Sequence, residues 1–144
     1  MKRFSFRLEK ILEIRKYHER EWELKLAEIT GTCMRIEGEI RYLLSERSEA
    51  FQKRHLSLER DISYLLYSEL YMQRLQQSAD RLSRDLREKE KILEEVRDQY
   101  REASKQRKIL EKLKEKRQKE NYKKQRDEEI KAIDDIALSN YRGM

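Results

Sequence analysis

Histidine and cysteine, two residue types that often bind metals or act as nucleophiles, are scarce in this sequence. His18 and His55 are its only histidines and Cys33 is its only cysteine, and no pair among them has the spacing of metal ligands. Cys33 also lies on an apolar ladder of helical spacing, which favours a small packed side chain over a nucleophile. A single cysteine forms no intrachain disulfide and fits a reducing compartment. These residues therefore indicate neither a metal site nor a catalytic thiol.

Two other signals of catalysis, a phosphate-binding loop and a pair of facing carboxylates, are also weak. Gly31 and Gly38 stand alone within helical ladders, whereas phosphate-binding loops are rich in glycine. Asp134 and Asp135 are adjacent, so a helix would direct their side chains about 100° apart. We therefore expect no enzymatic activity, no cofactor, no metal ion and no small-molecule substrate.

The composition indicates that long helices position these residues. Of the 144 residues, 44% are charged, none is proline and three are glycine. Average domains carry about 25% charged residues and about 5% proline, and compact sheets need frequent turn residues. The sequence therefore predicts an all-α protein with extended helices, and it argues against an enzyme with a cleft.

One apolar ladder, with alternating steps of three and four residues, dominates the first third of the sequence. Such steps place one stripe of a helix against a partner helix, as in a coiled coil. Arg15 and Glu19 interrupt its extension towards Leu8 and Leu12, so we expect looser packing in the first turns. Trp22 is interpreted as a packing anchor rather than a ligand site. The predicted seam residues of this ladder are Trp22, Leu26, Ile29, Cys33, Ile36, Ile40 and Leu43.

Two further ladders follow in shifted positions. A short one contains Phe51, His55, Leu58, Ile62 and Leu65. A long one begins at Leu75 and has polar steps at Lys89 and Arg107. Each shift marks either a stutter in one helix or a turn. The long ladder contains Ala79, Tyr100, Ala103 and Leu110, and its predicted seam residues are Leu82, Leu86, Leu93 and Val96.

A hairpin is the economical way to bury these ladders. A single helix would be about 216 Å long and could bury its stripe only against another chain. Ser57, Asp61 and Ser63 are candidate N-cap residues near a ladder shift, although chain symmetry alone would put the turn nearer residue 72. We predict one antiparallel coiled-coil hairpin over residues 1–144. Its parts are a helix at about 5–55, a turn at about 56–61, a longer helix at about 62–138 and a flexible tail at 139–144.

Charge is concentrated near the end of the longer predicted helix. The net charge is +6, and residues 105–126 hold 11 lysines and arginines against three glutamates. Such a basic stripe attracts nucleic acid, anionic lipid or an acidic protein, or it is simply a solvated helix face. The apolar ladder thins there, so we expect fraying in the free protein and order in a complex. The longest apolar run is Tyr64–Tyr67, and the start lacks the run of a signal peptide, so we expect a cytoplasmic protein.

A group of tyrosines follows the predicted turn. Tyr64 and Tyr71 share a helical face with Leu75 and Ser78, and this face differs from the one that carries Ile62. Aromatic side chains on a second face suit a protein-binding patch. A wider core contact near the turn is the alternative interpretation.

Motifs at both ends of the sequence resemble those of a known family. The first is Phe4-x-Phe6-x-Leu8-Glu9-Lys10-x-Leu12-x-x-Arg15-Lys16-x-x-Glu19. The second is Glu111-Lys-Leu-Lys-Glu-Lys-Arg117, followed by Tyr122, by Glu128 or Glu129, and by Asp134-Asp-Ile-Ala137. In type and order, these motifs and the chain length resemble the FliJ family of flagellar type III export proteins.

The resemblance implies a hairpin similar to the central stalk of rotary ATPases. It implies a non-enzymatic protein that binds the hexameric flagellar export ATPase, promotes its assembly and activity, and links it to the cytoplasmic domain of the membrane export gate. It also implies escort of export chaperones and peripheral association with the inner membrane at the flagellar base. The implied ATPase-ring contacts are Phe4, Phe6, Arg7, Arg15, Lys124, Arg126, Asp134 and Asp135.

The resemblance also implies a surface that contacts the export gate. Tyr71 and Leu75 match an aromatic residue and a leucine of the family, and Ser78 and Leu82 continue that surface with different residue types. On the first helix the family surface can carry tyrosines, whereas the comparable spacing here offers Leu43, Glu46 and Ala50. The first-helix half of the predicted gate site therefore departs from the family pattern.

Two alternatives remain open at the level of sequence. One is a generic cytoplasmic coiled-coil scaffold or chaperone that forms homodimers through the same seams. The other is a nucleic-acid-binding coiled coil that uses the basic stripe. Nucleic acid ranks last, because only Tyr122 could stack on bases within the stripe and acidic residues lie nearby.

Overall fold

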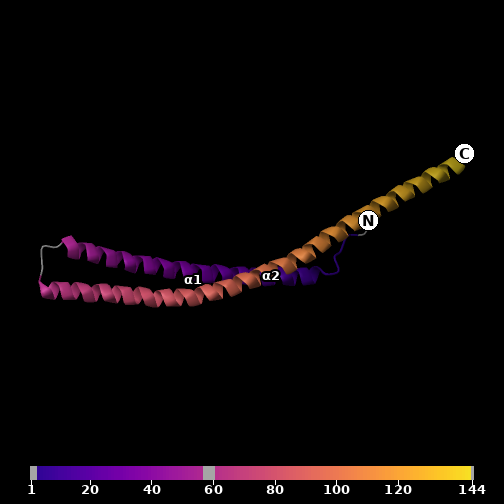
Figure 1. Ribbon diagram of the computed structural model, residues 1–144. Helices are drawn as coiled ribbons and strands as arrows, with labels where there is room; N and C mark the ends of the chain where they lie inside the picture. Colours follow the sequence, from indigo (N-terminus) through magenta and orange to yellow (C-terminus); the bar gives the residue numbers. More distant parts are fainter. Residues whose placement is uncertain (1–2, 57–60, 144) are drawn as a thin grey trace. The chain divides into compact units, whose positions relative to one another are not determined.

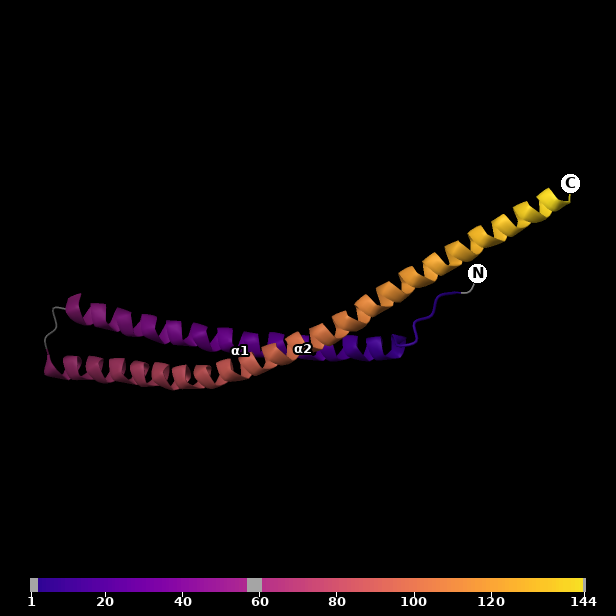
Figure 2. The ribbon, with the colours of Figure 1, turned by 45° about the vertical axis from the view of Figure 1, so that its right-hand side comes forward.

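Two long helices make up the structure, a computed structural model that describes residues 3–56 and 61–143. Helix α1 is Glu9–Leu56 and helix α2 is Ile62–Arg142, and the described residues form no strand. The two helices run in opposite directions and pack against each other (Figures 1 and 2). The predicted all-α class, with two helices in a helical hairpin, is confirmed.

The helices divide into two compact units. The central unit is Glu21–Tyr100, and the terminal unit combines Met1–Arg20 with Arg101–Met144. Each unit therefore contains a segment of α1 and a segment of α2. The prediction of one hairpin over residues 1–144 did not include this division into two units.

The central unit has a seam of apolar and small side chains. Its buried residues are Cys33, Ile36, Ser68, Met72 and Ala79, and they recur along each helix in steps of three and four or their multiples. The predicted seam residues Trp22, Leu26, Ile29, Ile40, Leu43, Leu82, Leu86, Leu93 and Val96 are half-buried. Their positions agree with two helices that each cover one stripe of the other.

Ser68 and Met72 connect the two ladders that the sequence analysis treated as separate on α2. They connect Leu65 to Leu75 in unbroken steps of three and four, so the α2 seam has no stutter there. Ser68 is 7% exposed, and its small side chain allows the helices to approach without a gap. Of the other predicted ladder members, Phe51 and Ile62 are exposed, and Leu58 lies outside the described residues.

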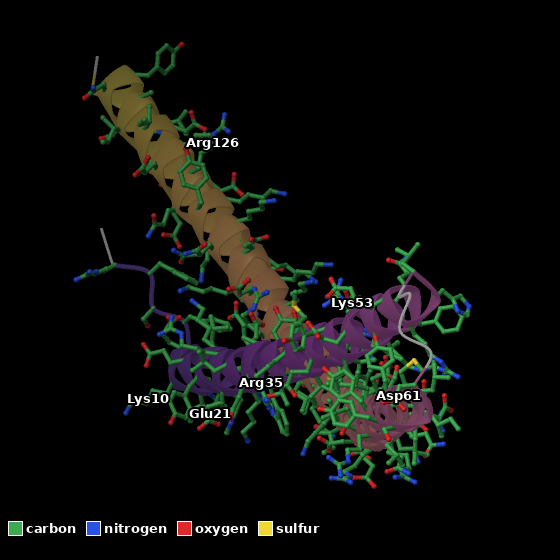
Figure 3. All side chains as sticks on the ribbon, turned by 90° about the vertical axis from the view of Figure 1, so that its left-hand side faces the viewer. Lys10, Glu21, Arg35, Lys53, Asp61 and Arg126 are labelled. Carbon is green, nitrogen blue, oxygen red and sulfur yellow. The ribbon has the colours of Figure 1, made fainter. Side chains whose placement is uncertain are left out.

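The first turn of α2 has an identifiable cap. Asp61 Oδ1 accepts a hydrogen bond from the backbone N–H of Ser63 at 3.2 Å, which satisfies one of the donors that a helix start leaves unpaired. Figure 3 labels Asp61 at the beginning of this helix. Of the other candidate caps, Ser63 lies inside α2 and Ser57 lies outside the described residues.

The two chain ends differ from the expected boundaries. Helix α1 begins at Glu9 rather than near residue 5, and residues 7–8 form a turn directly before it. Helix α2 continues to Arg142, so residues 139–142 are helical where a tail was expected. No proline interrupts the segment, and Ile133, Ile136 and Leu138 are tolerated in a helix. The described residues 126–143 are exposed throughout, and Figure 3 shows side chains projecting all around this stretch near Arg126.

Candidate functional site

The terminal unit contains a groove between the start of the chain and α2. Phe4 and Phe6 are half-buried while Ser5 and Arg7 are exposed, an alternation that is typical of an extended segment. Leu8, also half-buried, lies in a turn that the Glu9 N–H closes by donating to the Phe6 carbonyl at 3.1 Å. The groove has a volume of about 510 Å³, and we call it the end groove; it is lined by Phe4, Ser5, Phe6, Arg7, Leu8, Leu113, Arg117, Glu120, Asn121 and Lys124.

The end groove brings together half of the predicted ring-contact residues. Phe4, Phe6, Arg7 and Lys124 all line it, although they come from opposite ends of the sequence. Arg15 is exposed on α1 and does not line it. Arg126, Asp134 and Asp135 are exposed on α2 beyond it. Sequence reasoning missed Arg117 and Asn121, and the Phe4-x-Phe6-x-Leu8 alternation was the signal that could have indicated the extended segment.

A layer of charged side chains joins α1 and α2 in the terminal unit. Arg107 donates through Nε to Glu19 Oε2 at 2.5 Å and through Nη1 to Glu111 Oε2 at 2.5 Å. The hydrogen bond that Arg107 donates to Glu19 is the main reason that the pKa of Arg107 is raised above its ordinary value, and burial opposes it. Lys16 lies 3.9 Å from Glu111, between Nζ and Oε1. We call Lys16, Glu19, Arg107 and Glu111 the charged layer.

The charged layer changes the interpretation of the polar seam positions. The side chains of Glu19 and Arg107 are only 17% and 21% exposed. Each charge therefore offsets the cost of partly burying the other, at a level of the seam that has no apolar residues. A further pair joins the helices closer to the chain ends, with Lys114 Nζ 2.8 Å from Glu9 Oε2. Residues 105–114, where the apolar ladder begins to thin, therefore do have partners on α1.

A second candidate surface lies in the central unit, around Tyr71. Glu46, Tyr42 and Tyr67 all lie close enough to the Tyr71 hydroxyl to affect its pKa. Burial is the first cause that raises the pKa of Tyr71, and the charge of Glu46 is the second. Tyr42, Tyr67 and Tyr71 are 64%, 71% and 39% exposed. We call Tyr42, Glu46, Tyr67 and Tyr71 the tyrosine patch.

The tyrosine patch includes residues that sequence reasoning did not select. Of the predicted gate-contact residues, Tyr71 belongs to it, whereas Leu75, Ser78 and Leu82 are half-buried. Tyr42 was missed because it stands one residue before Leu43 in the α1 ladder, and its neighbours on α2 could not be inferred from spacing within α1. The first helix therefore does offer a tyrosine on this side of the hairpin.

The surroundings of Cys33 and Trp22 are typical of packed side chains rather than of a reactive site. The thiol of Cys33 is 5% exposed, and burial, followed by the charges of Glu90 and Glu37, raises its pKa above the ordinary value. A raised pKa leaves the thiol protonated at neutral pH, which disfavours nucleophilic attack. Trp22 is half-buried and lies under the Lys25 ammonium group, 4.4 Å from its ring centroid.

The chemistry available to these surfaces is that of binding. Among the described residues, no group of three or more histidine, cysteine, aspartate or glutamate side chains is arranged to hold a metal ion. No described helix has a stretch long and apolar enough to cross a membrane. The end groove combines aromatic side chains with arginine and lysine, and the tyrosine patch combines aromatic rings with a carboxylate. Both combinations are typical of protein-protein contacts.

Comparison with known proteins identifies the family. A search of curated proteins and a search of solved structures both found no match. A family model described as Flagellar FliJ protein matches residues 4–143 of the 144-residue chain. The match includes both the end groove and the tyrosine patch. The chain belongs to the FliJ family, which implies a role related to flagellar export.

Proposed function

We propose that the chain is a stalk-like component that binds the hexameric flagellar export ATPase through its terminal unit and promotes assembly and hydrolysis. The single observation that supports this most is the end groove. It gathers Phe4, Phe6, Arg7 and Lys124, which the family resemblance had separately assigned to ring contacts. Two phenylalanines beside basic side chains form an anchor that suits an acidic, partly apolar protein surface.

The uncovered end of α2 also fits this role. Residues 126–143 are exposed and carry Arg126, Asp134 and Asp135 on a helix without a neighbouring α1 segment. A charged helix surface makes few deep contacts, so it can bind a ring of subunits without being locked to one of them. Mostly polar contacts also favour rapid release over tight binding.

We further propose that the tyrosine patch contacts the cytoplasmic domain of the membrane export gate. Its three exposed rings offer apolar area at a low cost in side-chain entropy, and the nearby Glu46 adds a polar group beside Tyr71. With the ATPase at one unit and the gate at the other, the chain would link them at the cytoplasmic face of the inner membrane. Export chaperones are the third proposed class of partner.

The test of the stalk proposal is a titration of the full chain into the purified flagellar export ATPase. Hydrolysis and hexamer formation are followed together, and both should rise with a plateau near one chain per six ATPase subunits. The double variant F4A/F6A should lose most of the stimulation. The matched control is F51A, which removes an exposed phenylalanine of the central unit.

Each outcome of this titration is informative. If the wild-type chain stimulates neither hydrolysis nor hexamer formation, the stalk proposal is wrong and a scaffold role is favoured. If F4A/F6A stimulates as well as F51A, the end groove is not the ring contact. In a separate pull-down with the gate domain, Y71A should weaken binding about tenfold, the loss expected for one interface anchor, while Y122A should not.

A further inference from the structure

The part of α2 beyond the charged layer carries a stripe of side chains, all exposed except the half-buried Leu113, whose charges are complementary to those of a second, antiparallel copy. In steps of four and three, the stripe starts at Leu113 and ends at Leu138. Steps of this kind keep residues on one face of a helix. We call it the self-complementary stripe; its members are Leu113, Arg117, Glu120, Lys124, Asp127, Lys131, Asp134 and Leu138.

The complementarity becomes clear when two antiparallel copies of α2 are related by a twofold axis that passes between Gln125 and Arg126. Across this axis an antiparallel second copy brings Asp127 to the level of Lys124, Lys131 to the level of Glu120, and Asp134 to the level of Arg117. The two ends of the stripe then meet as Leu113 with Leu138. Each ionic residue of the stripe faces one of opposite sign, and each pairing occurs twice because of the symmetry.

The charged residues beside the stripe also face residues of opposite charge or a neutral residue across the axis. The twofold axis brings Asp135 to the level of Lys116 and Glu128 to the level of Lys123. Glu129 meets Tyr122, so no carboxylate meets another carboxylate. A parallel pair of chains would instead place each charge level with its own copy, which is repulsive.

Other antiparallel alignments are poorer. A shift by one heptad in one direction places Glu129 level with Glu115 of the second copy. A shift by one heptad in the other direction places Glu129 level with its own counterpart. Since both shifts bring carboxylates together, the charge pattern selects one alignment.

These charges are exposed, although Arg117, Glu120 and Lys124 also line the end groove beside the start of the chain. The ionic stripe members and their flanking partners are all exposed, and none takes part in an ion pair with another described residue. They also form the walls of a shallow groove of about 350 Å³ at the position of the axis, lined by Glu120, Lys123, Lys124, Asp127, Glu128 and Lys131. Beyond the axis, Ile130 and Ile133 are 48% and 64% exposed and would gain cover.

We propose that the chain forms an antiparallel homodimer through this stripe, with a second copy as the partner. Exposed ion pairs are individually weak and sensitive to salt, so the dimer should be reversible and favoured at low ionic strength. The partner's Leu138 would approach Leu113 at the apolar wall of the end groove. The dimer does not depend on the proposed function, and its test does not use the ATPase.

The test is sedimentation equilibrium of the full chain at about 100 μM in low and high salt, with two charge-reversal variants. D127K/D134K makes the stripe basic, and R117E/K124E makes it acidic. Each variant alone places like charges opposite each other and should be monomeric. An equimolar mixture restores opposite charges at all these positions and should contain a heterodimer. E88K/E95K is the matched control, with the same charge change and spacing in the central unit.

The results of sedimentation equilibrium either support the proposed dimer or overturn it. A wild-type dimer that weakens in salt, is absent in both variants and returns in their mixture supports the proposal. A wild-type monomer in low salt overturns it and leaves the stripe to a different partner. A dimer that persists in D127K/D134K also overturns it, because association then uses another surface. Circular dichroism verifies that the variants remain helical.

Discussion

The central and terminal units hold their helices together by different means. In the central unit the buried residues are apolar or small, with Cys33, Ile36, Met72 and Ala79 on the seam. In the terminal unit Leu12 is the buried residue among those described, and ion pairs cross between the helices. Apolar burial provides most of the free energy of folding, whereas ion pairs, whether exposed or partly buried, provide little net stability. The central unit is therefore expected to be the more stable one, and the terminal unit the more adaptable.

The largest effect is expected at the apolar seam. Ile36 is 1% exposed, so I36A should lower the free energy of unfolding by about 2–4 kcal/mol through lost burial and a cavity. M34A, at a residue that is 64% exposed, should change it by less than about 0.5 kcal/mol. Urea unfolding followed by circular dichroism measures both.

A second variant, L12A, tests whether the two units differ in stability. Leu12 is also 1% exposed, and L12A should accelerate hydrogen exchange in the terminal unit while the amides around Ile36 stay protected. Equal loss of protection in both units would show that they unfold together, and the proposed difference in stability would then be wrong.

An intermediate effect is expected in the charged layer. R107L leaves Glu19 and Glu111 without their partner and should cost about 1–2 kcal/mol. The double variant E19L/R107L replaces the pair by leucines and should be neutral or stabilising, as for other partly buried ion pairs. R84L, at an exposed position on α2, is the control. If the double variant is the least stable of the set, the layer contributes stability as well as specificity.

The smallest effect strengthens the central unit. Gly31 and Gly38 lie inside α1 without positive φ, and a Cβ atom at either position meets no other atom within 4 Å. G31A and G38A should therefore each stabilise the protein by about 0.5–1 kcal/mol. G143A, beyond the last helical residue, should have no measurable effect. A rise in the thermal midpoint for the first two variants alone supports this expectation.

Periodicity predicted the fold because it depends on the spacing of apolar residues within one helix. The α1 ladder from Trp22 to Leu43 and the α2 ladder from Leu75 are half-buried or buried throughout. The connection through Ser68 and Met72 could not be predicted in the same way, because serine counts as polar although it is small enough for a tight seam. The start of α1 at Glu9 depends on packing of Phe4 and Phe6 against α2, which requires the partner helix.

The candidate surfaces were predictable only in part, for a related reason. Residue types at the two ends indicated Phe4, Phe6, Arg7 and Lys124, but they did not reveal that one groove contains them all. Likewise, the sequence marks Glu19 and Arg107 as interruptions of two ladders. Their pairing depends on the antiparallel alignment of α1 and α2, which neither ladder contains by itself.

The pair of Glu19 and Arg107 has a consequence for the kinetics of folding. Two helices with long, repetitive apolar stripes can slide past each other and become trapped in a misaligned state. A slip of one heptad would place the guanidinium group of Arg107 against Leu12 or Leu26 and remove its bond to Glu19, leaving only Glu111 of its own helix as a partner. Because a partly paired charge against leucine is costly, such misaligned states are expected to be short-lived. The pair of Glu19 and Arg107 is therefore expected to favour the correct alignment during folding.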